Sequence, residues 1–261
     1  MTKYALTNID PSTDGNVLTS DGTNWISEAP AGGGGASTPQ FTYNFVVNGM
    51  EAVTAGMVRG DTGSGGSVAW ANTYGMRIGT GSASNGEAGI LPYNTVNSNA
   101  TVFNVYDRNP QVHMMVGVSG ASYASAFFGI DGDYYTYDPT TYKSMGFQVD
   151  IVAGVETIYA YNTDGTAGTK TDVTTACEAT DGFGWNTTYQ NLYSIIMTSG
   201  TDIKFYCNGT LVATHTTNLP SGGLTYVSTQ YLWRCGIKGT ASNASNNWVT
   251  VREANIKLDI V

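Results

Sequence analysis

Hydrophobic and polar residues alternate along most of the chain after residue 40. Because successive side chains of a β-strand point to opposite faces of a sheet, this period of two predicts strands that bury one face. The alternating segments are 41–47, 50–58, 68–78, 101–106, 112–118, 145–152, 155–161, 192–197, 203–207, 211–216, 232–237 and 248–261. β-Branched and aromatic residues fill the repeating positions, and apolar residues do not recur at helical spacing without glycine, so we expect very little helix.

One hairpin carries the sharpest local signal. Asn208-Gly209 favours a type I′ turn, and the alternation on both sides places Ile203, Phe205 and Cys207 on one face. About a dozen antiparallel strands are too many for one open sheet in a domain of this size. We therefore predict an all-β fold of two packed antiparallel sheets, a jelly roll or a related sandwich.

A glycine-rich run separates a short N-terminal tail from this body. Residues 30–39 read PAGGGGASTP and offer little that could join a core. They predict a linker between a tail, residues 1–29, and a sandwich domain, residues 40–261.

The tail contains one predicted β-hairpin. Residues 16–20 and 23–26 flank Asp21-Gly22, a dipeptide that suits a two-residue turn. A lone two-stranded hairpin is marginal in water, so its apolar side chains must pack on another copy of the chain or on another protein. The residues with this predicted anchoring and oligomerisation role are Val17, Leu18, Trp25 and Ile26.

Composition and charge restrict the classes of partner that the chain can bind. Glycine accounts for 33 of the 261 residues, 17 are tyrosine, and only 12% are charged, which is typical of a turn-rich β protein with an uncharged polar surface. The formal net charge is −9 and no basic cluster occurs, so we expect neither nucleic-acid binding nor membrane insertion. The opening residues lack the apolar run of a secretion signal. The cysteines are three in number and widely spaced, which predicts mostly buried free thiols in a protein assembled in a reducing compartment.

Two resemblances extend this interpretation. Residues 192–197 (LYSIIM), 203–212 (IKFYCNGTLV) and 251–259 (VREANIKLD) resemble the C-terminal half of a concanavalin A-like, or laminin G-like, sandwich. Residues 14–25 (DGNVLTSDGTNW), followed by the glycine-rich run, are similar to a segment that recurs in bacteriophage tail-fibre and other virion fibre proteins. That similarity implies a virion attachment tail, commonly trimeric, joined to a distal sandwich and assembled in the host cytoplasm.

Two loops offer candidate binding residues. The segment 131–138 (DGDYYTYD) gathers three carboxylates and three tyrosines, which could stack on a sugar ring or ligate calcium, or could simply form an exposed turn. Trp185, in a glycine-rich loop, is either a glycan platform or a lid over the core. The candidate glycan or receptor residues are Asp131, Asp133, Tyr134, Tyr135, Tyr137 and Trp185.

The sequence contains no clear motif of paired carboxylates or of a catalytic triad. A retaining glycosidase needs two carboxylates about 5 Å apart, often delivered by an E-x-D-x-x-E strand, and the six glutamates of this chain occur singly. The nearest pair, Asp150 and Glu156, straddles a predicted turn at Gly154. His113 and His215 lie on predicted strands without a triad partner nearby in sequence. We therefore expect no catalytic residue, no cofactor and, apart from calcium in the 131–138 loop, no metal.

Together these observations predict a non-enzymatic bacteriophage virion protein of fibre type. Its tail would bind other virion proteins and form a homotrimer, and its sandwich would recognise a host-surface glycan or protein. Two alternatives remain: a capsid decoration or head-fibre protein that stabilises the particle, and a depolymerase that cleaves glycans.

Overall fold

The structure is a computed structural model of residues 1–261, and it divides into two compact units, residues 1–39 with 260–261 and residues 40–259. It describes backbone and side chains for 75–80, 104–120, 123–130, 142–180, 190–223, 234–240 and 247–259. It describes the backbone alone for 17–20, 25–28, 40–46, 58–62, 67–71, 87–92, 131 and 181. Among these residues, no helix is both long and apolar enough to cross a membrane.

The N-terminal unit contains a two-stranded antiparallel hairpin, which confirms that prediction. Strand β1 (Val17–Ser20) pairs with β2 (Trp25–Glu28), from Val17 opposite Glu28 to Ser20 opposite Trp25. This register leaves residues 21–24 between the paired ends, so the predicted two-residue turn at Asp21-Gly22 is wrong. The side chains of Val17, Leu18, Trp25 and Ile26 lie outside the described part of the structure, and their anchoring role stays a prediction.

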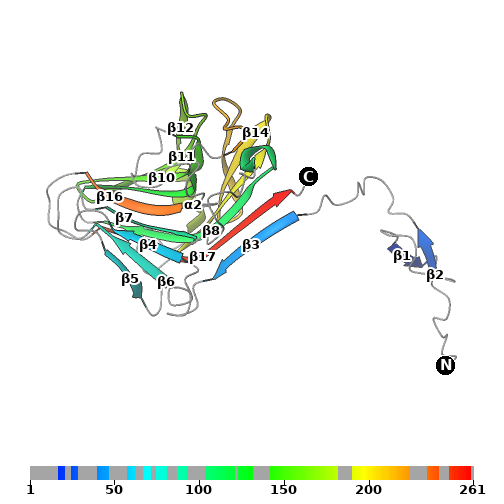
Figure 1. Ribbon diagram of the computed structural model, residues 1–261, viewed down its shortest axis with the longest axis horizontal. Coiled ribbons are helices and arrows are strands. Elements are labelled where there is room, and N and C mark those ends of the chain that lie inside the picture. Colours follow the sequence, from blue (N-terminus) through cyan, green and yellow to red (C-terminus); the bar gives the residue numbers. More distant parts are fainter. Residues whose placement is uncertain are drawn as a thin grey trace. The chain divides into compact units, whose positions relative to one another are not determined.

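Residues 40–259 form two antiparallel sheets, which confirms the predicted sandwich (Figure 1). The seven-stranded sheet has the order β12 (Gly168–Asp172), β11 (Val155–Thr163), β10 (Ser144–Val152), β9 (Ala124–Asp131), β16 (Arg234–Gly239), β7 (Glu87–Pro92) and β4 (Val58–Thr62). The eight-stranded sheet has the order β15 (Thr210–His215), β14 (Asp202–Cys207), β13 (Asn191–Thr198), β8 (Gln111–Ser119), β17 (Trp248–Asp259), β6 (Gly75–Gly79) and β5 (Ser67–Ala71), and β3 (Gln40–Val46) also pairs with β17.

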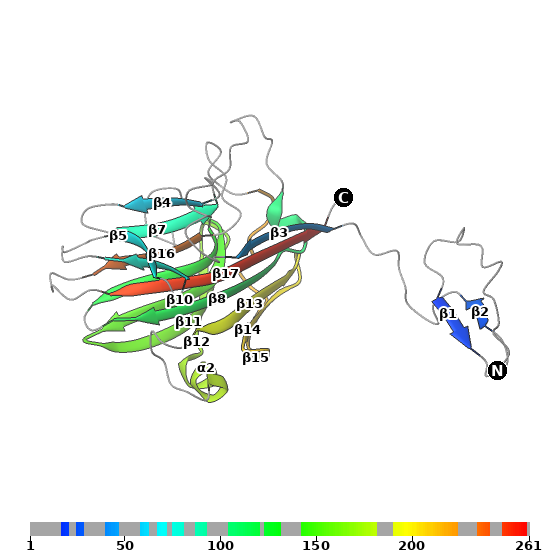
Figure 2. The ribbon, with the colours of Figure 1, turned by 90° about the horizontal axis from the view of Figure 1, so that it is seen from below.

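Two short helical elements accompany the strands in the described residues. Helix α2 (Thr174–Asp181) contacts β11 and β15 (Figure 2). It therefore lies at the edge where β12 ends one sheet and β15 ends the other. The 3₁₀ helix η1 (Val105–Asp107) precedes β8 and buries Val105 and Tyr106.

The core lies between the sheets, as alternation requires. On β10, Phe147, Val149 and Ile151 are fully buried. Phe147 contacts Phe128 and Tyr193, with ring centroids 5.7 and 4.7 Å away, so aromatic side chains from both sheets meet at the centre. The cysteines at 177, 207 and 235 are free and buried, which confirms the prediction for the thiols.

The turns of two hairpins follow the sequence closely. Asn208 and Gly209 have φ of 48° and 81°, which confirms the predicted type I′ turn between β14 and β15. Ala153 and Gly154 have φ of 50° and 80° and form the matching turn between β10 and β11. This second turn fixes the register in which Asp150 lies opposite Thr157 and Glu156 lies opposite Ile151.

Some predicted strands are wrong. The single strand expected at 68–78 is two strands, β5 and β6, because Gly75 at φ 90° begins a new strand that folds back on the first. In the strand expected at 101–106, residues 105 and 106 belong to the 3₁₀ helix η1 instead, and residues 101–103 lie outside the described part of the structure. Strands β7, β9 and β12 were not predicted, nor was β4 beyond Val58. Strand β9 reads ASAFFGID, with apolar or small residues on both faces, and β12 reads GTKTD, an edge strand without apolar residues.

Candidate functional site

The outer face of the seven-stranded sheet carries a group of polar side chains. Because Phe147, Val149 and Ile151 face the core, Gln148 and Asp150 emerge on the opposite side of β10. Strand pairing extends this group across the sheet. The residues on this face, here called the Asp150 cluster, are Ser125 on β9, Gln148 and Asp150 on β10, Tyr159 on β11 and Lys170 on β12.

Hydrogen bonds converge on the Asp150 carboxylate. Ser125 Oγ donates to Asp150 Oδ1 at 2.6 Å, and Gln148 Nε2 donates to the same oxygen at 2.8 Å. Lys170 Nζ donates to Oδ2 at 3.0 Å and completes an ion pair. Burial by itself raises the pKa of Asp150, but these hydrogen bonds and the Lys170 charge outweigh it and lower the pKa below the ordinary value. Asp150 is therefore ionised at neutral pH.

A tyrosine ring lies beside this carboxylate. Lys170 Nζ lies 3.7 Å from the centroid of the Tyr159 ring, so the ammonium group touches both the carboxylate and the aromatic face. The Lys170 and Asp150 side chains are 36% and 29% exposed, and Tyr159 is half-buried. Solvent and a ligand can therefore reach acidic, basic, amide and aromatic groups within one small area.

Behind Tyr159, two buried aromatic residues lie on the same face. Phe127 and Tyr161 form a cluster separate from the main core and are 0% and 5% exposed. Gly146, the cross-strand neighbour of Tyr161, leaves space for them, because a Cβ there would lie 2.5 Å from Phe127 Cζ. Two buried aromatic side chains therefore pack on the outer face of the sheet beside the polar Asp150 cluster.

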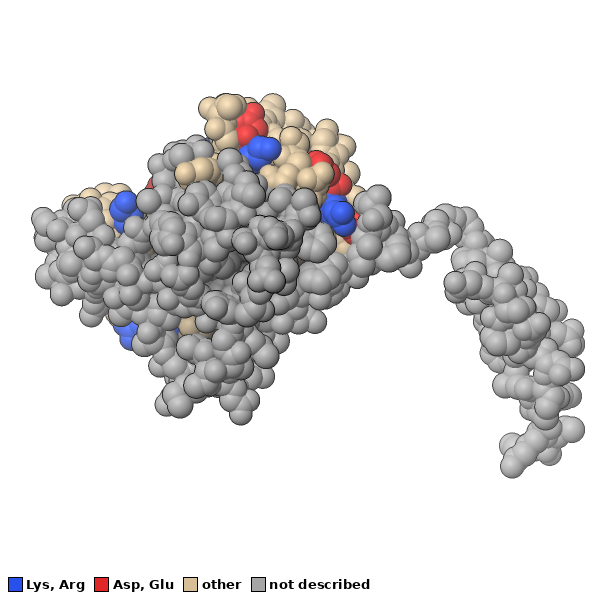
Figure 3. Space-filling model, in the orientation of Figure 1, with Lys and Arg blue, Asp and Glu red and all other residues tan. Residues whose placement is uncertain are grey.

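Charge on the described surface is mixed. In the view of Figure 3, described Lys, Arg, Asp and Glu side chains lie in small groups of both signs. Among the described residues, no three His, Cys, Asp or Glu side chains gather as metal ligands would. A ligand that approaches these residues therefore meets hydrogen-bonding groups rather than a field of one sign.

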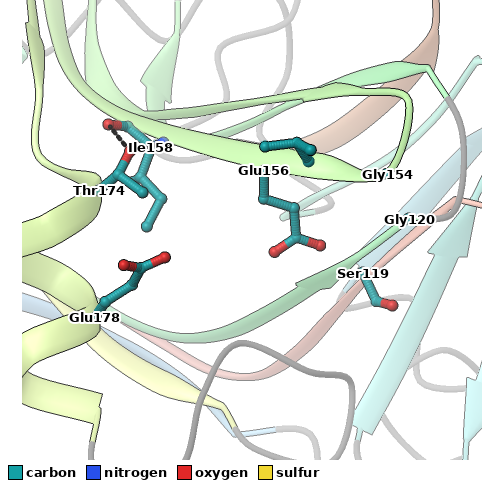
Figure 4. A pocket seen from close by; sticks show the side chains of 8 residues that line it. Ser119, Gly120, Gly154, Glu156, Ile158, Thr174 and Glu178 are labelled. Atoms are coloured by element: carbon teal, nitrogen blue, oxygen red, sulfur yellow. Dashed lines mark hydrogen bonds between the residues drawn. The ribbon is translucent and has the colours of Figure 1, made fainter.

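A pocket of about 520 Å³ opens near the turn between β10 and β11. Figure 4 shows the carboxylates of Glu156, on β11, and Glu178, on α2, directed into this pocket from two sides. The other residues that line it are Ser119, Gly120, Gly154, Val155, Ile158 and Thr174. The volume lies within the range of small-molecule sites.

The two glutamates of the pocket differ in environment. Burial raises the pKa of Glu156 to about 7, and a hydrogen bond from the Gly120 backbone N–H only partly offsets this effect. Glu178 is exposed on α2. Near pH 6 the pocket therefore holds a protonated carboxyl group that can donate a hydrogen bond and, facing it, an exposed glutamate.

Local contacts hold both sides of the pocket in place. A Cβ at Gly120 would lie 2.4 Å from Ile151 Cδ1 and 2.5 Å from Asn247 Oδ1, so glycine lets β8 end close to β10. Thr174 Oγ1 accepts the Ile158 N–H at 2.9 Å and donates to Asp172 Oδ1 at 2.7 Å, which fixes the start of α2 against β11.

The residues predicted from the loops are not tested by the described structure. Asp131 ends β9, opposite Ser144, and its side chain lies outside the described residues. Asp133, Tyr134, Tyr135, Tyr137 and Trp185 also lie outside them. Their glycan-binding role, and calcium in the 131–138 loop, stay predictions.

The sequence named Asp150 and Glu156 together, but the structure separates them. Their register in the hairpin places Asp150 on the outer face and Glu156 on the side of Ile151. The sequence did not identify Ser125, Gln148, Tyr159 and Lys170 of the Asp150 cluster, or Glu178 of the pocket. The available signal was the polar pair Gln148 and Asp150 alternating with buried residues on an otherwise apolar strand.

The two histidines have partners from other strands. His113 Nδ1 lies 2.8 Å from Ser194 Oγ across β8 and β13, on the outer face of the eight-stranded sheet. His215 is buried, with Asn162 and Thr171 as hydrogen-bond partners from the other sheet. Burial lowers the pKa of His215 to about 4, so this histidine is neutral and links the two sheets.

Comparison with known proteins shows the fold. No family model and no curated protein matches the chain. The chain is similar to a Crh5 transglycosylase in complex with NAG, with 12% identity, a TM-score of 0.53 and 84% of each chain covered. It is also similar to the CBM2 module of the evolved Dit of Lactobacillus casei BL23 phage J-1, with 13% identity, a TM-score of 0.50, and 85% of this chain and 98% of that chain covered.

Proposed function

We propose that the chain is a non-enzymatic bacteriophage virion protein of fibre type whose β-sandwich binds a host-surface glycan through the Asp150 cluster. The observation that carries the binding proposal is the ionised Asp150 carboxylate beside the Tyr159 ring, with Gln148 and Lys170 in hydrogen-bond contact. Glycans present hydroxyl groups at their edges and C–H groups on their ring faces, and this cluster offers partners for both.

The hydrogen-bonding capacity of the cluster suits sugar hydroxyls. A carboxylate has about four lone-pair positions, and the cluster uses three of them for Ser125, Gln148 and Lys170. The Gln148 carbonyl and the Lys170 ammonium add an acceptor and a donor. Because these side chains already constrain one another, a sugar would bind a preorganised set of groups.

The virion part of the proposal rests on two observations. Residues 14–25 resemble a segment of virion fibre proteins, and the sandwich is similar in structure to a module of a phage Dit protein. In this proposal the tail anchors the chain to other virion proteins and forms a homotrimer, and the sandwich is displayed. Three copies of a weak glycan site gain avidity when they bind together. Light scattering of the full chain would measure the mass, and a monomer would contradict the trimer.

A matched pair of substitutions tests the glycan site in the full chain. Asp150→Asn removes the charge of the cluster, whereas Asp202→Asn removes the charge of another Asp–Lys pair, Asp202 with Lys204 at 3.3 Å, on β14. We expect D150N to lose at least tenfold in binding to an array of bacterial surface polysaccharides, and D202N to bind as the unsubstituted chain does.

Other outcomes would contradict this proposal. Equal binding by D150N and the unsubstituted chain would place recognition elsewhere. Binding to no polysaccharide, together with particles that lose stability when the protein is deleted, would favour the capsid decoration alternative. Release of oligosaccharides from a polysaccharide would favour the depolymerase.

A further inference from the structure

Two of the three buried thiols lie in contact. Cys177 lies in the middle of α2, and Cys207 is the last residue of β14, directly before the turn at Asn208-Gly209. Both cysteines are 0% exposed and belong to the same hydrophobic cluster, and the Cys177 thiol is hydrogen-bonded to the Cys207 thiol. The third thiol, Cys235, lies on β16 in the other sheet. The fold therefore brings a pair of thiols together from two elements that are distant in the chain.

Cys177 is the residue that attaches α2 to the core. Of the α2 residues whose side chains are described, 174–180, it alone is buried. Helix α2 has eight residues, which is too few for a helix to be stable in water without tertiary contacts. The apolar packing that keeps α2 on the sandwich therefore depends on this one side chain and on the core residues that it meets, which include Cys207.

Hydrogen bonds beside this contact link the backbone segments that carry the two cysteines. Asn208, the residue after Cys207, donates from Nδ2 to the Thr180 backbone oxygen in a long hydrogen bond of 3.5 Å. Thr180 Oγ1 donates to the Cys177 backbone oxygen at 2.8 Å. Asn208 is itself fixed, because its Oδ1 accepts the Leu192 backbone N–H at 2.9 Å. The two thiols therefore face each other across a junction that is also held by polar groups.

We propose that Cys177 and Cys207 are a cross-linking site, at which a small-molecule disulfide oxidises the two thiols to a disulfide bond that joins α2 to β14. The step consists of two thiol–disulfide exchanges. One cysteine thiolate attacks a sulfur atom of oxidised glutathione and displaces the first glutathione thiolate. The other cysteine thiolate then attacks the mixed disulfide and displaces the second. The displaced thiolates take up the two cysteine protons, so one oxidised glutathione is reduced to two glutathione thiols.

Burial decides when this reaction can take place. The hydrogen bond with Cys207 and burial raise the pKa of Cys177, so its thiol stays protonated at neutral pH. Because the thiolate is the nucleophile, the closed chain reacts slowly, and the reactive form is one in which α2 has opened from the core. The thiols stay free in a reducing cytoplasm and meet an oxidising medium outside the cell. This timing rests on the proposed virion role, whereas the cross-link itself does not.

Oxidation of the folded full chain tests the site. The chain would be incubated with oxidised glutathione, denatured, treated with iodoacetamide to cap the remaining thiols, and analysed by intact mass and peptide mapping. We expect one free thiol, Cys235, and one cross-link between Cys177 and Cys207, which should form faster at urea concentrations just below the unfolding transition. Three free thiols at every such concentration, glutathione adducts that persist, or a cross-link that includes Cys235 would overturn the proposal.

Matched substitutions add a second readout. Cys235→Ala should still form the cross-link, whereas Cys177→Ala and Cys207→Ala should not. Because the cross-link closes a loop in the unfolded chain, oxidation should lower the unfolding equilibrium constant of C235A in urea by at least about tenfold. C177A should unfold in the same way with and without oxidised glutathione.

An equal change in C235A and C177A, or no change in C235A, would show that the two thiols pack only as small apolar side chains and would overturn the proposal. If one of these variants does not fold, the peptide map of the unsubstituted chain decides alone. Because neither readout uses a glycan, this proposal can fail while the Asp150 cluster still binds polysaccharide.

Discussion

Asp150 and Glu156 lie on the same hairpin and are both partly withdrawn from water, yet their pKa values move in opposite directions. Asp150 accepts hydrogen bonds from Ser125, Gln148 and Lys170, which more than offset its burial. Glu156 accepts one from the Gly120 backbone N–H, which does not. The number and charge of the donors around each carboxylate therefore decide whether they overcome the effect of burial on its pKa.

The largest expected effect of this contrast between Asp150 and Glu156 is on the pH dependence of the free energy of unfolding. The pKa of Glu156 is raised from 4.5 to about 7 in the folded chain. The contribution of this group to the free energy of unfolding is therefore fully present below pH 4.5 and is lost as the pH rises through 7. At about 1.4 kcal/mol for each pKa unit, the free energy of unfolding falls by roughly 3.4 kcal/mol at pH 8.5.

Glu156→Gln should remove that loss, because glutamine does not titrate. Urea unfolding at pH 5 and pH 8.5 would show a smaller decline in the free energy of unfolding for E156Q than for the unsubstituted chain. Parallel declines would show that Glu156 titrates as an ordinary glutamate.

The second largest effect is expected at Gly120, whose backbone N–H donates to Glu156. Gly120→Ala would crowd Ile151 and Asn247 and move the N–H that Glu156 accepts. Because the crowded atoms are side-chain ends that can shift, we expect a cost of about 1 kcal/mol in the free energy of unfolding. The pKa of Glu156, followed by NMR, should rise further. An unchanged pKa would show that this N–H does not stabilise the carboxylate.

The smallest effect concerns Lys170. Lys170→Met should lower stability by about 0.5 kcal/mol, since the Lys170–Asp150 pair is partly exposed. It should also raise the pKa of Asp150, because the ammonium group helps to lower it. Lys204→Met, in the pair with Asp202, is the matched control and should leave Asp150 unchanged. A pKa of Asp150 that does not respond to K170M would assign the stabilisation to Ser125 and Gln148 alone.

Much of the fold could be predicted from the sequence because alternation and turn residues act locally. Asn208-Gly209 specified its turn, and the strands on both sides followed. The same reasoning failed for β9, where apolar residues occupy both faces, and for β12, which has no apolar face. Such strands are determined by their neighbours in the sheet and not by their own pattern.

The candidate sites depended on distant parts of the chain. Ser125, Asp150 and Lys170 come from three strands, and Gly120 and Glu178 approach Glu156 from two other elements. Asp150 and Glu156 were both visible in the sequence as isolated acids near Gly154.

By itself, the sequence determined the all-β class, the turn at Asn208-Gly209 and the presence of the N-terminal hairpin, because strand periodicity and turn conformation depend on adjacent residues. Tertiary structure alone decided that Asp150 and Glu156 emerge on opposite faces of one sheet, with several donors around one and a pocket around the other. The physical reason is that a carboxylate's charge depends on the groups which surround it in space, and pairing between strands brings those groups together from distant positions in the chain.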